Sequence, residues 1–164
     1  MRFALLDRVL EVVPGERIVA VKAVSLAEEY LADHFPTFPV LPGVLMLEAL
    51  VEAGRWLVWK TTGFAQSTIL LREAKNVTYK TFVAPGRTLR VEVIARRIGP
   101  GESEFAGTGY CEDKEAVKAR FALAHWNLAD KNPELAQADR RLLESARARW
   151  ALLVGAGEGR GVGV

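Results

Sequence analysis

The chain has 164 residues, and half of them are hydrophobic, which is enough for one domain with a sizeable core. Its formal net charge is +2, with lysines and arginines scattered along the chain, so nucleic acid is not an expected partner. Its single cysteine excludes an internal disulfide and favours an intracellular, cytoplasmic location. No secretory signal is indicated, and charged residues interrupt the most apolar stretch, so no membrane association is expected.

The first elements predicted are a hairpin and a short helix. Residues 8–13 and 17–24 are rich in Val and Ile and flank the turn signal Pro14-Gly15, which predicts two antiparallel strands. Ser25 and Glu28 have the spacing of a capping box, which predicts a helix running through Leu31 and ending before His34.

A proline-stiffened loop and a long apolar helix follow. The loop HFPTFPVLPG has three prolines that fix φ, so it is pre-shaped. Residues 44–60 are apolar almost all round, and Thr61, Thr62 and Gly63 close the segment. A helix of this kind must be buried on most sides, which a sheet wrapped around it would achieve.

The next part of the chain alternates between apolar and polar residues. The alternation predicts strands over residues 69–79, 88–98, 104–112 and 116–128, separated by turn signals, so consecutive strands should run antiparallel. One long helix against an antiparallel sheet is an α+β domain.

A second amphipathic helix is predicted near the C-terminus. Asn132-Pro133 suits its start, and apolar residues recur at helical spacing from Leu135 to Leu153. The glycine-rich segment 155–164 should be disordered. We therefore divide the chain into a domain at 1–130, a helical extension at 131–154 and a tail at 155–164.

His34 and the start of the long helix are the first candidates for chemistry. An isolated loop histidine usually bonds to backbone, but Pro42-Gly43 places free helical N–H groups beside the loop that contains His34. Such donors can hold a thioester oxygen and stabilise negative charge, while a neutral imidazole removes an adjacent proton.

Three charged residues lie inside the apolar helix. Burial of Glu48 would raise its pKa and make it a general acid. Alternatively, Glu48 belongs to a solvated strip with Glu52, Arg55 and Trp59, in which Glu52 and Arg55 form an ordinary ion pair. The spacing supports both interpretations equally for Glu48 and favours the ion pair for Glu52.

The other candidates have structural explanations. His125 shares a strand face with Phe121 and Leu123, as a satisfied core histidine would, and Cys111 is expected to be a small buried hydrophobe. The tryptophans suit core or interface positions. The basic residues usually form a solvated face, but they could attract an acidic carrier protein or a cofactor phosphate; they are Arg72, Lys75, Lys80, Arg87, Arg90, Arg96 and Arg97.

The segment HFPTFPVLPGVLMLEAL resembles the active-site segment of the 3-hydroxyacyl-[acyl-carrier-protein] dehydratases, in their FabZ-type form, which carries Glu in the helix. The likeness extends over residues 5–128 and includes NVTYKTFVAPGRTL. It implies a hotdog fold and a dimer, with His34 of one chain facing Glu48 of the other; the sequence does not distinguish a single dimer from a trimer of dimers. His34 would abstract the C2 proton, Glu48 would protonate the leaving hydroxyl, and the Gly43 N–H would polarise the carbonyl. Neither metal nor bound cofactor is implied.

This chain departs from that family at three positions. Thr37 replaces the usual Gly, Glu52 replaces a Gln, and Arg87 replaces an acidic turn residue. A second carboxylate one turn from Glu48 could raise the pKa of Glu48 unless Arg55 offsets it. Glu52 and Arg55 thus form a possible secondary site.

Three functions are compatible with these residues. The first is dehydration of a (3R)-3-hydroxyacyl thioester, carried by acyl carrier protein or coenzyme A, in fatty acid synthesis or a related acyl pathway. The second is a hotdog thioesterase, in which a helix carboxylate activates water, and the third is a non-catalytic acyl-binding subunit. The pair His34 and Glu48 favours the dehydratase.

Overall fold

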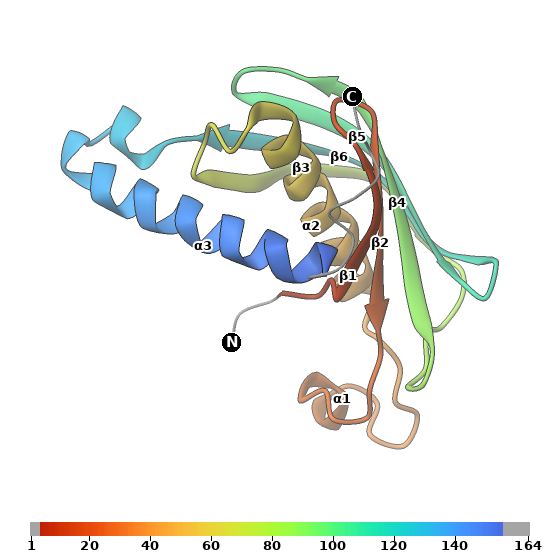
Figure 1. The fold of residues 1–164 in the computed structure, drawn as a ribbon. Helices are drawn as coiled ribbons and strands as arrows, with labels where there is room; N and C mark the ends of the chain where they lie inside the picture. Colours follow the sequence, from red (N-terminus) through yellow and green to blue (C-terminus); the bar gives the residue numbers. More distant parts are fainter. Residues whose placement is uncertain (1–3, 156–164) are drawn as a thin grey trace.

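The computed structural model describes residues 4–155 and is built around a single antiparallel sheet (Figure 1). The sheet has six strands in the order β1-β2-β4-β5-β6-β3. The strands are β1 Arg8–Val13, β2 Arg17–Ala23, β3 Thr68–Tyr79, β4 Thr88–Ile98, β5 Glu102–Cys111 and β6 Lys114–Trp126. All the predicted strands are confirmed, with ends that differ from the prediction by two residues at most.

The predicted hairpin is present at the amino end of the described chain. Val13 pairs with Arg17 across the turn, where Gly15 has a φ of 81°, a left-handed conformation that glycine adopts without strain. β2 then pairs with β4 rather than with β3, the next strand in sequence, which pairs with β6 at the far edge of the sheet.

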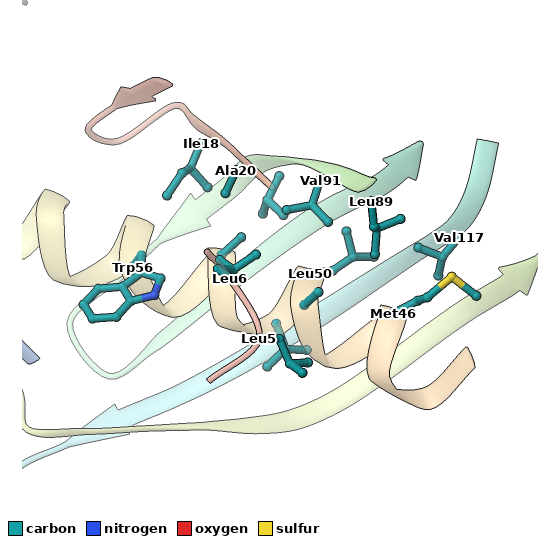
Figure 2. Close-up of a cluster of buried hydrophobic side chains, with 14 of the residues drawn as sticks. Leu5, Leu6, Ile18, Ala20, Met46, Leu50, Trp56, Leu89, Val91 and Val117 are labelled. Carbon is teal, nitrogen blue, oxygen red and sulfur yellow. The ribbon is translucent and has the colours of Figure 1, made fainter. Parts of the chain in front are cut away.

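The sheet curls around α2, Gly43–Thr62, as the apolar composition of this helix predicts (Figure 1). Gly63 ends the helix in a left-handed conformation. Met46, Leu50 and Trp56 of α2 point into a cluster with strand residues such as Val91 (Figure 2). A second glycine lets α2 approach the sheet closely: a Cβ at Gly54 would lie 2.8 Å from the Phe121 ring of β6.

Within residues 4–155, no helix is both long and apolar enough to cross a membrane.

The predicted helix at Ser25 begins later than expected. Residues 25–29 form turns, and α1 spans Tyr30–Asp33 alone. The Ser25 hydroxyl accepts the N–H of Ala27, but the Glu28 carboxylate bonds to Lys22 Nζ at 2.5 Å. A capping box needs that carboxylate to turn back to the first residue of the helix, so the ion pair with Lys22 has replaced the capping box.

The second long helix, α3, spans Ala136–Val154 and lies on the open side of the sheet, alongside α2 (Figure 1). Two short 3₁₀ turns, Leu128–Asp130 and Pro133–Leu135, lead into it. The Trp150 ring lies 5.7 Å from that of Trp56, and Arg149 Nη2 donates to the Leu6 carbonyl. The expected apolar face is only partly buried, since Leu142 is 45 % exposed. The tail that the sequence predicts to be disordered lies, beyond Gly155, outside the residues that the structure describes.

Candidate active site

The loop between α1 and α2 positions His34. His34 follows the last residue of α1, and its N–H donates to the carbonyl of Tyr30, the first residue of that helix. The half-buried imidazole packs 4.5 Å from the Phe35 ring. Phe35 has a φ of 49°, which is unusual for a bulky side chain, and its carbonyl accepts the N–H of Phe38 in a tight turn. Strained residues of this kind persist where the surrounding chain fixes them, and here Pro36 and Pro39, which follow Phe35, restrict the backbone of the loop.

The N-terminus of α2 faces the same loop. Pro42 caps the helix without a side-chain hydrogen bond, so the first N–H groups of α2 have no acceptor within the helix. A Cβ at Gly43 would lie 3.1 Å from the Tyr79 ring, which explains why glycine stands here. These N–H groups and the positive end of the helix dipole suit a carbonyl oxygen that gains negative charge.

His34 and Gly43 line one pocket, with a cavity of about 260 Å³, which we call the His34 pocket. The remaining lining residues are Phe35, Val40, Leu41, Met46, Tyr79, Lys80, Thr81 and Phe82. Of these eight, only Lys80 was a candidate from the sequence, as one of the basic residues that could attract an acidic carrier protein or a cofactor phosphate. The segment NVTYKTF in the resemblance contains four of the eight. Burial raises the pKa of the Tyr79 hydroxyl, so it stays protonated at neutral pH. The walls are mostly apolar, which suits an acyl group.

Glu48 lies outside the lining of the His34 pocket. Its Oε1 accepts a hydrogen bond from Arg55 Nη1 at 2.7 Å, and the two side chains are 26 % and 22 % exposed. The predicted ion pair between Glu52 and Arg55 is therefore wrong, because Arg55 reaches back two turns to Glu48. One chain alone thus brings together the histidine and the helix amides, but not the acid.

Glu52 is buried rather than part of a solvated strip. Its Oε2 accepts the N–H groups of Leu5 at 2.7 Å and Leu6 at 3.1 Å, and Oε1 lies 3.4 Å from the Trp56 indole nitrogen. Burial raises the pKa of Glu52 even though these donors favour the carboxylate. The carboxyl group thus holds the segment before β1 against α2.

Two other expectations about single residues are confirmed. His125 is buried, and its ring nitrogens bond to Ser103 Oγ, at 3.0 Å, and to Gln66; burial lowers its pKa, so it stays neutral. Cys111 is buried in the core.

Arg87, which replaces an acidic turn residue of the family, forms an ion pair with Glu112 across the turns that border β4 and β6.

A sheet curled around one central helix, with a pocket at the helix N-terminus, defines the hotdog class of proteins. Solved structures share this fold at low sequence identity. The dehydratase heterocomplex ApeI:P from Xenorhabdus doucetiae superposes with a TM-score of 0.67, at 18 % identity over 82 % of this chain and 90 % of that one. A Streptococcus mutans protein solved with acetyl CoA gives a TM-score of 0.60, at 12 % identity over 77 % of this chain and 94 % of that one.

Sequence comparison narrows the class to a family. Residues 1–120 match the family model of the FabA-like domain, and this chain belongs to that family. It is 38 % identical over 133 residues to a 3-hydroxyacyl-[acyl-carrier-protein] dehydratase FabZ from Symbiobacterium thermophilum, covering 80 % of this chain and 92 % of that protein. A protein of the same name from Rhizorhabdus wittichii is 39 % identical over 119 residues, covering 71 % and 76 %.

Proposed function

We propose that the protein dehydrates a (3R)-3-hydroxyacyl thioester, carried by acyl carrier protein, to the trans-2-enoyl thioester in fatty acid biosynthesis. The main support is the juxtaposition of His34 with the amides of Gly43 at the start of α2. The FabZ dehydratases to which the chain is similar carry this activity in their names. A cytoplasmic location belongs to the same proposal, and the single buried thiol of Cys111 is compatible with a reducing compartment.

In this proposal, His34 and Gly43 act on the acyl end of the thioester. The N–H of Gly43 donates to the thioester carbonyl oxygen and stabilises the enolate-like charge that develops there. The neutral imidazole of His34 takes the C2 proton, and the electron pair of that C–H bond forms the new C2–C3 double bond.

Glu48 completes the reaction by donating its proton to the C3 hydroxyl as the C–O bond breaks, so that water leaves. The glutamate becomes a carboxylate, and its hydrogen bond from Arg55 stabilises that charge. A proton moves from His34 back to Glu48 before the next turnover. Because Glu48 lies outside the His34 pocket, the proposal places the His34 of one chain opposite the Glu48 of a second chain.

The sheet offers an edge for that second chain. β3 pairs with β6 along one side, and its other side is an edge of the sheet, with Leu70 and Leu71 51 % and 39 % exposed. A long exposed edge strand with apolar side chains is a natural pairing surface. We therefore propose a homodimer with a joined sheet, either alone or as the unit of a trimer of dimers. Light scattering distinguishes these assemblies.

Incubation with a 3-hydroxyacyl thioester of acyl carrier protein, followed by both enoyl absorbance and free thiol, tests the function. The parent protein should form enoyl product, and His34→Ala or Glu48→Ala should lower kcat by roughly 10²–10⁴-fold. Thiol release without enoyl product would instead identify a thioesterase. Neither product, across several chain lengths, would indicate an acyl-binding role.

A further inference from the structure

Tyr79 packs against the start of α2. It is the last residue of β3, where it pairs with Val117 of β6, and its ring reaches across to Gly43. The three atoms nearest to a Cβ built on Gly43 all belong to this ring: Cε1 at 3.1 Å, Cδ1 at 3.2 Å and Cζ at 3.3 Å. Cζ carries the hydroxyl, so the hydroxyl oxygen lies only one C–O bond beyond an atom that is this close to the first residue of the helix.

The Tyr79 hydroxyl is a hydrogen-bond donor without a protein acceptor. In the part of the chain that the structure describes, no group accepts a hydrogen bond from it. Tyr79 is 46 % exposed and lines the His34 pocket, so a molecule in the pocket can reach this side chain. Tyr30 also has an unpartnered hydroxyl, but that oxygen is fully buried and offers no donor to a ligand.

The backbone supplies one donor to the His34 pocket. The third and fourth N–H groups of α2 both donate to the Pro42 carbonyl, which leaves those of Gly43 and Val44 for a ligand. Gly43 lines the pocket, whereas Val44 is 68 % exposed and lies outside its lining. A carbonyl oxygen that gains negative charge during a reaction is typically held by more than one donor. The position beside Gly43 is occupied by Tyr79.

Two other polar side chains line the pocket without taking that position. Lys80 is paired with Glu115, whose carboxylate lies 2.8 Å from Nζ. Thr81 contributes no atom to the three nearest to the Cβ position of Gly43, and neither does Lys80. Tyr79 is therefore the side-chain donor best placed to act together with the Gly43 N–H.

We propose that the Tyr79 hydroxyl is a catalytic group, a second hydrogen-bond donor to the thioester carbonyl oxygen beside the Gly43 N–H. This inference rests on the proposed dehydratase function. As His34 takes the C2 proton, the electron pair of that C–H bond delocalises onto the carbonyl oxygen, and both hydrogen bonds strengthen with the charge. The pair then forms the C2–C3 double bond as the C3–O bond breaks, so Tyr79 keeps its proton throughout.

Tyr79→Phe tests the proposal, because it keeps the ring against Gly43 and removes only the hydroxyl. With a 3-hydroxyacyl thioester of acyl carrier protein, kcat should fall roughly hundredfold with little change in KM, since the hydrogen bond is strongest in the transition state. Tyr110→Phe removes a hydroxyl outside the pocket, from a ring that lies 5.1 Å from the Arg90 guanidinium, and should behave as the parent. An unchanged kcat in Tyr79→Phe would overturn the proposal, as would equal losses in both variants.

Infrared spectroscopy of a bound thioester detects the hydrogen bond without turnover. A saturated butyryl thioester, with an isotope label at the carbonyl carbon, lacks the C3 hydroxyl and cannot be dehydrated. Its C=O band should lie at lower frequency in the parent than in Tyr79→Phe, because each donor weakens the C=O bond. Identical band positions in the two proteins would overturn the proposal.

The two measurements separate this inference from the proposed function. Enoyl product from the parent, with a lower kcat and a shifted C=O band in Tyr79→Phe, supports both. A parent that forms no enoyl product but shows the band difference would contradict the dehydratase function and still support Tyr79 as a donor to the carbonyl oxygen. Enoyl product with equal kcat values and equal bands would support the function and overturn the role of Tyr79.

Discussion

The buried carboxylate of Glu52 should be a main support for the N-terminal segment. In Glu52→Ala, the N–H groups of Leu5 and Leu6 lose the acceptor that they now reach at 2.7 and 3.1 Å. Each buried, unsatisfied donor costs about 1–3 kcal/mol, whereas alanine does not weaken the helix itself. For the two donors together, we therefore expect the free energy of unfolding to fall by about 2–6 kcal/mol.

Glu52→Gln separates the hydrogen bonds from the charge. The glutamine oxygen can accept from the same backbone groups, but it does not titrate. Because burial raises the folded-state pKa of Glu52 above its ordinary value of 4.5, the folded parent protein holds this proton to higher pH than the unfolded chain does. The contribution of Glu52 to stability is therefore fully present below the ordinary pKa and declines as pH rises through the folded pKa. Glu52→Gln should lack this decline.

Urea unfolding of the parent and both variants measures these effects, at one protein concentration and at mildly acidic and mildly alkaline pH. This role of Glu52 predicts a large loss of stability for the Ala variant at both pH values, and a Gln variant whose stability is closest to, or above, that of the parent at alkaline pH. An Ala variant that unfolds at the same urea concentration as the parent would refute it. So would a Gln variant as unstable as Ala.

Two further substitutions test the packing and the electrostatics of α2. Gly54→Val puts a side chain within 2.8 Å of the Phe121 ring, so we expect a loss of about 1–3 kcal/mol in thermal or urea unfolding; an unchanged stability would mean that the helix does not sit this close to β6. Arg55→Met removes the partner of Glu48 and should lower kcat by roughly ten- to a hundredfold with little change in KM, with partial recovery in Arg55→Lys. Arg97→Gln, which breaks an exposed Arg–Glu pair, is the control, and an equal effect in both would exclude a positioning role.

Local patterns predicted most of the fold. Alternation of apolar residues located four of the strands, and Val- and Ile-rich runs around a turn signal located β1 and β2. The all-round apolarity of α2 indicated a helix that is buried on most sides, which a sheet wrapped around it achieves. The helix expected at Ser25 was misplaced for a physical reason. Lys22 pairs with Glu28, and this contact between a strand and a turn is not visible in helical spacing.

The candidate site was predictable in part. The proline-rich loop before a helix N-terminus indicated that His34 and Gly43 would lie together, and they line one pocket. The partners of the helix charges were not predictable. Glu52 bonds to backbone amides 46 and 47 residues away, and the choice of Arg55 between two carboxylates depends on which of them is buried. Such contacts follow from the packing of distant segments.

Complementation between two inactive variants tests the central claim, that His34 of one chain works with Glu48 of another. The variants His34→Ala and Glu48→Ala are each inactive in the proposed mechanism. Unfolding and refolding them together should give mixed dimers, each with one intact pair, and about a quarter of the parent enoyl-forming activity for random pairing of equal amounts. If both residues acted within one chain, the mixture would stay as inactive as its components, and the account of the site would be contradicted.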